Sequence, residues 1–565
     1  METAHSSIFC MNSENPNIGT QLDLMATRYG DRKALFEPLK RNSDGLFDYR
    51  VLTFAQLAEL TNHYATAFAA AGIGVGTRVL LLMKPGLELS AVVFALFKTG
   101  AVPILVDPGL GFKNMLGCIR RTEPEAMIAV NIVHWIRKVF PASFKTVRIN
   151  FGFGNFTPPG VTNLNHIIEI GELECRQRVS FETVHSSPDD IAAIVFTSGS
   201  TGPPKGVIYT HRIFQAQLKN ISQVYGAGPE QIDMSAFPLF ALLAVATGMP
   251  SVIPKMDFRH PAEVNPENII REINAHGVTF SFGSPALWRV TANYAIAHNL
   301  KMPKLKKVLM AGAPVGEELH RAVKAVIAVD GETWVPYGAT EALTTSTFSG
   351  TEMLAKTAVA TRDGAGYCVG YPNPGMEIKI IECRDGEIAQ WHPDLELSIG
   401  ERGEIVVRGD VVKAAYFNDA DATAKSEIAD SAGKWHRMGD TGYFDERGRL
   451  WFCGRKNHLV YADNMVCYPV CSEAVFNCHP AIYRTALVQG CDGAVLFVEP
   501  FATHYPRNAR SRARLTAELL ELGTEYPFTE KISDIRFIKA LPVDIRHNAK
   551  IFREKLSVLA GKRAR

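Results

Sequence analysis

The sequence predicts an α/β protein with a large N-terminal domain and a small C-terminal domain. Three observations lead to this prediction. The chain has 565 residues, more than the roughly 250–300 residues at which a single core stops growing. Apolar runs bounded by Gly, Pro and Asp alternate with helical patterns before residue 450, which is typical of α/β units with parallel sheet. The composition then changes near Gly454, which indicates a domain boundary.

The composition is that of an ordinary globular chain, with 47% hydrophobic and 21% charged residues. Its net charge of +2 gives no general attraction to nucleic acid, so no nucleic-acid partner is expected. No basic segment followed by an apolar run opens the sequence, which favours a cytoplasmic location. The uncharged stretch from Met234 to Pro254 has spanning length, but its Pro and Gly residues favour a buried helix beside an apolar pocket over a transmembrane segment.

The ten cysteines are scattered along the chain, and we expect most of them to be reduced and buried. Their one cluster is formed by Cys467, Cys471 and Cys478 with His479. The spacing lacks the paired CxxC knuckles of structural zinc sites. Core cysteines are therefore favoured over a metal site.

The first α/β unit is predicted at residues 78–109. RVLLLM at 78–83 is an apolar run typical of a strand, and a helical stretch follows from Glu88 to Lys98. AVPILVDPG at 101–109 is predicted to contain the next strand. A later apolar run, IAAIVF at 191–196, follows two aspartates and is predicted as a buried strand.

A loop rich in Gly, Ser and Thr leaves the end of that strand. FTSGSTGPPKG at 196–206 is not a Walker loop, because Lys205 lacks a Gly directly before it and a Ser or Thr directly after it. GVIYT at 206–210 is predicted as another strand, and Phe214, Leu218 and Ile221 follow at helical spacing. The loop is therefore predicted to join two strands, whereas a Walker lysine lies at the start of a helix.

A second domain is predicted to begin after the segment LWFCGRKNHLVYADN at 450–464, which looks like a strand, a basic turn and a new start. We place the hinge near Lys456 and Asn457, which gives domains of 1–456 and 457–565. The arginine-rich stretch RNARSRAR at 507–514 is predicted to be a solvated helical face.

Five further stretches accompany the loop in a fixed order: LVDPG at 105–109, AGAPV at 311–315, YGATE at 337–341, RMGDTGYFDERGRLWFCGRK at 437–456 and RHNAKI at 546–551. Together they resemble the adenylate-forming superfamily of acyl-CoA synthetases, peptide-synthetase adenylation domains and luciferases, over about residues 50–555. The resemblance implies an N-terminal AMP-binding domain made of two doubly wound α/β subdomains and a small β-barrel. It also implies a mobile α+β lid at the C-terminus.

The resemblance further implies that ATP activates a carboxylate as a mixed anhydride with AMP, with Mg²⁺ bridging phosphate oxygens. Lys205 would supply charge to the departing pyrophosphate. The hydroxyls and backbone amides of the loop would cradle its phosphates; these residues are Thr197, Ser198, Gly199, Ser200, Thr201 and Gly202.

The YGATE stretch would place Tyr337 and Gly338 at the nucleotide, with Tyr337 against the adenine. Thr340 would lie near the α-phosphate and Glu341 on the Mg²⁺. Without the resemblance, the same letters describe an ordinary strand end with a solvated glutamate.

Three further residues gain roles in the same way. Asp440 would accept hydrogen bonds from the ribose hydroxyls, and Arg455 would contact ribose or phosphate. Lys550 matches the lysine that the lid inserts beside the carboxylate and the α-phosphate, which adds a cation and excludes water on closure. Taken alone, Asp440 is an ordinary turn residue and Lys550 a surface lysine.

The acyl pocket is expected to be apolar, with walls from FPLFALLAVATGMP, AGAPV and SFGSPALW. We expect Phe237, Phe240, Gly312 and Ala313 to lie near the substrate.

The sequence departs from the thioester-forming members beyond the hinge. Those members have a glycine-containing turn that lines the path of the pantetheine thiol, whereas here no glycine occurs between Gly454 and Gly490, and Asn464 and Met465 stand at that turn. Asn457 replaces the usual hinge Asp or Lys, and RHNAKI carries Ala549 in place of Gly. These departures argue against CoA as the acceptor.

Together with these departures, three stretches make the resemblance more specific: FTSGSTGPPKGVIYTH, HRMGDTGYFDERGRLWFCGRK and VDIRHNAKIFREKL. They resemble the β-lactone synthetases of bacterial olefin biosynthesis. Such an enzyme adenylates a long-chain 2-alkyl-3-hydroxy fatty acid, whose own 3-hydroxyl then attacks the acyl carbonyl and expels AMP. Its implied partners are a thiolase-like condensing enzyme, a ketone reductase and a lactone decarboxylase. His211 is a candidate base by chemical type alone, and a structural role is favoured.

Two alternatives stay open. A long-chain fatty acyl-CoA ligase, or a fatty acyl-AMP ligase that loads a carrier thiol, would share the first half-reaction. A non-catalytic nucleotide-binding protein is disfavoured, because it would have no need for the lid lysine.

Overall fold

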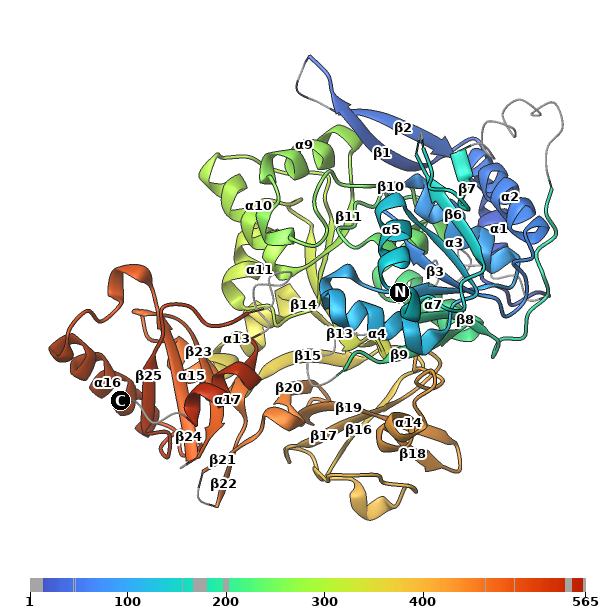
Figure 1. Cartoon of the computed structure of the whole chain (residues 1–565). Coiled ribbons are helices and arrows are strands. Elements are labelled where there is room, and N and C mark those ends of the chain that lie inside the picture. Colours follow the sequence, from blue (N-terminus) through green and yellow to red (C-terminus); the bar gives the residue numbers. More distant parts are fainter. Residues whose placement is uncertain are drawn as a thin grey trace.

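The structure is a computed structural model that describes residues 14–43, 45, 47–154, 156–165, 180–196, 203–462, 464–491, 493–543 and 551–561. It has the predicted α/β fold, with two large sheets in the N-terminal part and a small C-terminal part that lies to one side of them (Figure 1). Among the described residues, no helix is both long and apolar enough to cross a membrane. The stretch from Met234 to Pro254 instead contains the short helix α8 (Pro238–Ala246).

The first sheet has seven strands in the order β7-β6-β5-β3-β4-β8-β9, and only β9 runs antiparallel to its neighbour. The strands are β3 (Arg78–Leu82), β4 (Val102–Leu105), β5 (Ala126–Val130), β6 (Ile149–Phe153), β7 (Thr162–Asn163), β8 (Ile191–Phe196) and β9 (Gly206–Thr210). Its helices are α2 (Phe54–Ala70), α3 (Leu87–Lys98), α4 (Phe112–Thr122), α5 (Asn131–Val139) and α7 (His211–Tyr225).

Both faces of this sheet are buried. Val79 and Leu81 of β3 belong to the core that contains α2 and α3, while Leu80 and Leu82 belong to the core that contains α4 and α5. Alternate side chains of a strand point to opposite faces, so helices cover the sheet on both sides. This arrangement explains why these strands read as continuous apolar runs.

The second sheet joins a parallel part to an antiparallel part in the order β11-β12-β13-β14-β15-β20-β19-β17-β16, with β18 paired to β19. The parallel strands are β11 (Phe280–Gly283), β12 (Lys307–Met310) and β13 (Glu332–Ala339). The others are β14 (Ala342–Ser349), β15 (Tyr367–Pro372), β16 (Glu377–Ile381), β17 (Gly403–Arg408), β18 (Glu427–Asp430), β19 (Gly433–Phe444) and β20 (Leu450–Arg455). The resemblance implies a small β-barrel, and in the structure the antiparallel strands continue the second sheet through the pairing of β15 with β20.

The remaining N-terminal elements surround these two sheets. A small third sheet joins β10 (Ser251–Val252) to β1 (Lys33–Arg41) and β2 (Phe47–Thr53). The other helices are α1 (Thr20–Tyr29), α9 (Pro266–His276), α10 (Pro285–Ala297), α11 (Glu317–Lys324), α12 (Gly350–Glu352), α13 (Ala358–Arg362) and α14 (Ala420–Ser426).

The C-terminal part begins after β20 with a short 3-10 helix at Lys456–His458 and a two-stranded ribbon of β21 (Val460–Ala462) and β22 (Met465–Cys467). A three-stranded sheet follows, in the order β23-β24-β25, with three helices packed around it. These elements are β23 (Ile482–Gly490), β24 (Gly493–Pro500), β25 (Asp534–Phe537), α15 (Pro469–Asn477), α16 (Ala509–Thr524) and α17 (Arg553–Ala560).

The cysteine cluster at the start of this part is divided by burial. Cys467 and Cys471 are buried, as predicted, whereas Cys478 is exposed. Within the described part of the chain, no group of three or more His, Cys, Asp or Glu side chains is placed to hold a metal ion.

A buried carboxyl links the third sheet to the second. Asp233 forms bridges to Ser251 of β10 and to Phe280 of β11, and it is fully buried. The hydroxyls of Ser235 and Ser251 donate hydrogen bonds to its two carboxyl oxygens. Because burial disfavours the charged form, the pKa of Asp233 is raised to about 7.

This carboxyl predicts a pH-dependent stability. Since the pKa of an aspartate in an unfolded chain is about 4, the folded protein keeps a proton that the unfolded chain has lost between pH 4 and 7, and stability falls as pH rises through this interval. We expect the thermal midpoint of the wild type to fall by several degrees more between pH 5 and pH 8 than that of Asp233→Asn. Parallel falls in calorimetry would contradict this assignment.

Candidate active site

The loop between β8 and β9 joins two antiparallel strands, as predicted, with Phe196 paired to Gly206. Its residues Thr197, Ser198, Gly199, Ser200, Thr201 and Gly202 lie outside the described residues. Lys205, at the end of the loop, lies with its Nζ 4.8 Å from the centre of the Tyr416 ring. The lysine is thereby held over an aromatic face, a contact that stabilises a cation.

Glu341 contacts the hydroxyl of the same tyrosine. The Tyr416 hydroxyl donates a hydrogen bond of 2.8 Å to Glu341 Oε1. Burial and the neighbouring carboxylate raise the pKa of Tyr416, so its hydroxyl stays protonated and acts as a donor. Tyr416 therefore connects the loop lysine to the glutamate of YGATE, two residues that are far apart in the sequence.

The tyrosine is itself fixed by backbone pairing with β9. Val207 and Tyr416 form an antiparallel bridge, and the Phe417 amide donates to the Gly206 carbonyl at 2.7 Å. Lys413 lies 4.4 Å from the same ring, and its buried ammonium pairs with Glu427 at 2.9 Å.

Sequence reasoning missed both Tyr416 and Lys413. Their one visible signal is composition, since AAYFND is a short apolar and aromatic run between charged residues. The bridge to β9 that gives this run its position joins segments some 200 residues apart.

A second group of predicted residues meets where β13, β19 and β20 come together. Tyr337 donates a hydrogen bond of 2.7 Å to Asp440 Oδ2, and Arg455 Nε lies 3.0 Å from Asp440 Oδ1. Asp440 and Arg455 are direct neighbours in the pairing of β19 with β20. The Asp440 carboxylate raises the pKa of Arg455, and burial with the same carboxylate raises that of Tyr337.

Gly338 lies near the end of β13, and Thr340 lies in the turn between β13 and β14. The Tyr209 hydroxyl of β9 donates to the Thr340 carbonyl at 2.7 Å, which joins YGATE to the strand after the Gly-rich loop. A Cβ atom at position 338 would lie 2.4 Å from the Ala342 carbonyl oxygen. Gly338 is therefore required by the close approach of two backbone segments, which is a structural reason for a glycine that the sequence assigned to nucleotide binding.

The predicted acyl-pocket residues differ in burial. Phe240 is 8% exposed and stacks on Phe282 with ring centres 4.7 Å apart, so it belongs to the core. Phe237 is 49% exposed and tilts against the same Phe282 ring at 6.2 Å. Gly312 and Ala313 lie in the loop after β12, where Gly312 has a positive φ of 95°. Phe282, which lies in the predicted wall segment SFGSPALW, is the ring shared by both phenylalanines.

His211 has a structural position, as the sequence favoured. It is 3% exposed, and its Nδ1 accepts a hydrogen bond of 3.1 Å from the Ile18 amide. Burial lowers its pKa to about 4. A buried ring that holds the N-terminal segment is not placed to take a proton from a substrate.

The predicted hinge is anchored on one side. Lys456 Nζ lies 3.1 Å from Glu404 Oε2 and donates to the Arg384 carbonyl at 2.8 Å. Glu404 also pairs with Arg437 at 2.7 Å, and both of these side chains are buried. Asn457 follows directly in the 3-10 helix.

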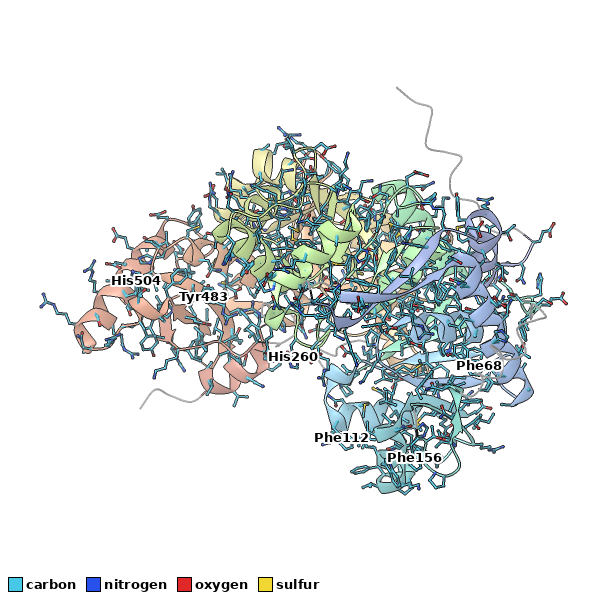
Figure 2. All side chains as sticks on the ribbon, turned by 90° about the horizontal axis from the view of Figure 1, so that it is seen from above. Phe68, Phe112, Phe156, His260, Tyr483 and His504 are labelled. Atoms are coloured by element: carbon cyan, nitrogen blue, oxygen red, sulfur yellow. The ribbon has the colours of Figure 1, made fainter. Side chains whose placement is uncertain are left out.

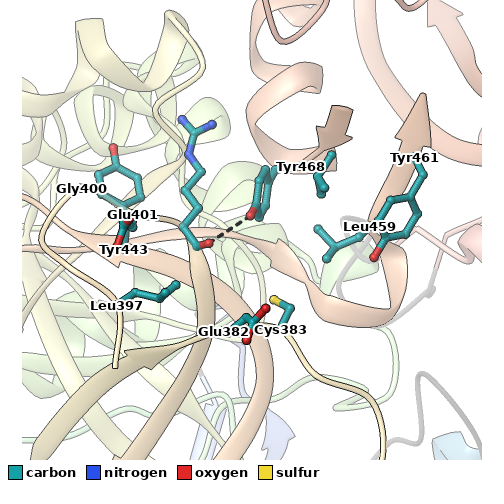
Figure 3. A pocket seen from close by; sticks show the side chains of 11 residues that line it. Glu382, Cys383, Leu397, Gly400, Glu401, Tyr443, Leu459, Tyr461 and Tyr468 are labelled. Carbon is teal, nitrogen blue, oxygen red and sulfur yellow. Dashed lines mark hydrogen bonds between the residues drawn. The ribbon is translucent and has the colours of Figure 1, made fainter. Parts of the chain in front are cut away.

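A cavity of about 830 Å³ lies beside this hinge, between the antiparallel strands and the β21–β22 ribbon (Figure 3). Arg402 contacts the rings of Tyr443 and Tyr468 there, and the Tyr468 hydroxyl donates to the Arg402 carbonyl at 3.2 Å. None of the described residues predicted for catalysis or binding lines this cavity. Its lining residues are Glu382, Cys383, Leu397, Gly400, Glu401, Arg402, Tyr443, Leu459, Tyr461, Val466 and Tyr468.

The residues that depart from the thioester-forming pattern lie on the same ribbon. Asn464 is exposed in its turn, and Met465 pairs with Ala462 across the two strands. Lys550 and Ala549 lie outside the described residues.

Known proteins resemble the chain over most of its length. The AMP-binding enzyme family matches residues 22–417. The olefin beta-lactone synthetases of Xanthomonas campestris pv. campestris and Stenotrophomonas maltophilia are 37% and 38% identical to the chain, covering 96% of it in both cases and 97% and 98% of those proteins. The amide bond synthetase McbA from Marinactinospora thermotolerans superimposes with a TM-score of 0.77 at 21% identity, covering 96% of this chain and all of that one, and shows a shared fold. The chain therefore belongs to the AMP-binding family of adenylate-forming enzymes.

Proposed function

We propose that the protein is an ATP-dependent β-lactone synthetase. It would adenylate the carboxylate of a long-chain 2-alkyl-3-hydroxy fatty acid with release of pyrophosphate, and the 3-hydroxyl would then attack the acyl carbonyl, release AMP and close the ring. The observation that carries this proposal is the 37–38% identity to two olefin beta-lactone synthetases over 96% of the chain. A role beside a thiolase-like enzyme, a ketone reductase and a lactone decarboxylase belongs to the same proposal.

The residues around Tyr416 support the first half-reaction. Lys205 would place its charge on the leaving pyrophosphate, together with the loop residues 197–202. Tyr416 fixes both Lys205 and Glu341 relative to the same ring, so the two charges have a set separation before substrate arrives. Groups held in advance of the reaction stabilise developing charge without reorganising.

The donor set at Glu341 fits Mg²⁺. A carboxylate is a hard oxygen ligand, and the Tyr416 hydroxyl orients it through one oxygen. Mg²⁺ is usually held by one or two carboxylates together with substrate phosphates, which agrees with the lack of a larger His, Cys, Asp and Glu group in the described residues. When bound, Mg²⁺ would offset negative charge on the phosphate oxygens.

The group of Tyr337, Asp440 and Arg455 supports binding of the adenosine end. The Asp440 carboxylate would accept from the ribose hydroxyls while Tyr337 and Arg455 hold it in place. A carboxylate held by a hydrogen bond and an ion pair keeps its orientation, so the ribose position would be defined before ATP binds.

The second half-reaction needs no external nucleophile. An intramolecular hydroxyl has a high effective concentration when the pocket holds it near the carbonyl, which helps to overcome the strain of a four-membered ring. We propose that CoA is not used, because the turn at Asn464 and Met465 lacks the glycine of thioester-forming members.

The domain division is part of the proposal. Residues 1–456 would hold the nucleotide, and residues 457–565 would act as a lid that brings Lys550 to the carboxylate and the α-phosphate. The anchoring of Lys456 to Glu404 supports a hinge that begins at Asn457.

The function is tested by product mass. The purified protein is incubated with ATP, Mg²⁺ and a 2-alkyl-3-hydroxy acid, with and without CoA. The proposal expects AMP, pyrophosphate and a product that is lighter than the acid by one water, whether or not CoA is present. A CoA thioester, with no dehydrated product in the absence of CoA, would instead identify an acyl-CoA ligase.

Asp440→Asn is expected to weaken ATP binding by about tenfold or more, because an amide nitrogen would face the donors that now hold the carboxylate, and charge-assisted hydrogen bonds would be lost. Titration calorimetry with ATP measures this change. Asp430→Asn, which breaks the ion pair with Arg408 at the outer end of β18, is the matched control and should leave ATP affinity unchanged. Equal affinities for all three proteins would remove Asp440 from the nucleotide site.

A further inference from the structure

An exposed apolar surface lies on and beside helices α4 and α5, which cover one face of the first sheet. It consists of one face of α5, the residue after α5, the start of α4 and the segment after β6. The side chains are Phe112, Ile132, Trp135, Val139, Phe140 and Phe156, and each is 40% or more exposed. We call these six residues the α5 patch.

The face of α5 is regular. Ile132, Trp135 and Val139 have the i, i+3, i+7 spacing of one helix face, and their exposures are 64%, 48% and 70%. Val133 and His134 are the buried residues of the same helix. The helix therefore buries Val133 and His134 against the sheet and has an apolar face on the outside.

The other three side chains adjoin this face. Phe112 and Phe140 pack edge to face with ring centres 5.1 Å apart, and the side-chain amide of Asn131 donates to the Phe156 carbonyl. Figure 2 shows Phe112 and Phe156 at the same edge of the molecule. Contiguous apolar surface of this kind marks an interaction site in soluble domains.

The charge around the patch is strongly positive. Residues 112–156 contain seven Lys or Arg residues and two acidic ones, Glu123 and Glu125. Both acids are paired, with Lys145 at 3.8 Å and with Arg78 at 3.2 Å. Lys113 follows Phe112 in α4 and is exposed, and Lys138 Nζ lies 4.5 Å from the Trp135 ring.

We propose that the α5 patch docks the protein on a lipid surface with anionic headgroups. Trp, Phe and Ile side chains flanked by Lys and Arg are the combination that lies flat in a membrane interface, with the apolar face in the acyl boundary and the cations at the headgroups. A second copy of the chain is a poor occupant, because a symmetric contact would bring two positive surfaces together.

Helix α4 connects this surface to the catalytic part of the fold. Phe112 begins the helix, and Arg121 near its end donates to the Pro204 carbonyl, directly before Lys205. Eleven residues of helix span about 16 Å. A protein docked through the α5 patch would thus hold the end of the Gly-rich loop within one short helix of the lipid surface.

Vesicle co-sedimentation of the full chain tests the proposal. We use phosphatidylcholine vesicles with and without a one-third fraction of phosphatidylglycerol, at low and at high salt. The protein should bind the anionic vesicles, bind less at high salt because of screening, and bind pure phosphatidylcholine at least about tenfold more weakly. Absence of binding to anionic vesicles, or equal binding to both compositions, would overturn the proposal.

Two variants locate the surface. The triple variant Ile132→Ser, Trp135→Ser, Val139→Ser should lower the bound fraction by about tenfold or more, whereas Val75→Ser, Val329→Ser, Ile399→Ser, a matched triple at apolar residues exposed elsewhere, should not. The double variant Lys113→Gln, Lys138→Gln leaves the apolar residues intact and should remove the preference for anionic vesicles. This variant tests the proposal even if the serine triple does not fold. Unchanged binding of the lysine variant, or a serine triple that turns a dimeric wild type into a monomer in light scattering, would overturn the proposal.

Discussion

Lys550→Ala is expected to lower adenylation by about a thousandfold while leaving ATP affinity nearly unchanged. The proposed lid brings this cation to the carboxylate and the α-phosphate, where negative charge gathers in the transition state, and one well-placed donor in a site without water contributes two to three orders of magnitude. Exchange of labelled pyrophosphate into ATP measures adenylation, and titration calorimetry measures ATP binding.

The matched control is Lys555→Ala. Lys555 lies five residues further on in α17, with its Nζ 4.8 Å from the Phe552 ring, and carries the same charge on the same part of the chain. Its exchange rate should equal that of the wild type. Undiminished exchange in Lys550→Ala would show that adenylation does not depend on this lysine.

Glu341→Gln is expected to lower pyrophosphate exchange by about a hundredfold, because an amide holds Mg²⁺ poorly. The metal stabilises the negative charge of the transition state by several kcal/mol. The loss should shrink as the Mg²⁺ concentration is raised, since the substitution weakens a metal ligand. Exchange rates measured over a series of Mg²⁺ concentrations give both quantities.

Tyr416→Phe distinguishes metal binding from orientation. It keeps the ring beneath Lys205 and removes only the hydroxyl that donates to Glu341, so we expect a loss of about tenfold with a smaller dependence on Mg²⁺. Glu318→Gln, at an exposed position in α11, serves as the control for charge. A Glu341→Gln enzyme with the wild-type rate at every Mg²⁺ concentration would contradict the proposed metal ligand.

Local patterns in the sequence predicted the elements around the Gly-rich loop. β8 is a six-residue apolar run because both faces of the first sheet are buried, and such a strand is visible without any tertiary information. The helix after β9 was visible because Phe214, Leu218 and Ile221 repeat with the helical period. These features depend on neighbours in the chain.

Features that depend on distant segments were not visible. Tyr416 gains its position from a bridge to β9, and the antiparallel strands join the second sheet through pairing of β15 with β20. Phe240 was expected to lie near the substrate, and its stacking on Phe282 joins two segments that are distant in the sequence. An apolar side chain in a predicted pocket wall can point into the pocket or into the core, and the sequence alone does not show which.

The ion pair of Lys456 with Glu404 bears on what a moving lid would carry with it. Since Lys456 is tied to the buried pair of Glu404 and Arg437, a pivot at Asn457 would leave Arg455 and Asp440 stationary. The ribose contacts would then persist during every movement of the lid. The AMP part of the acyl-adenylate would stay bound while the acyl carbonyl becomes accessible to the substrate's own hydroxyl. In this scheme the lid would time the ring closure, and nucleotide release would wait until the carbonyl has lost its phosphate.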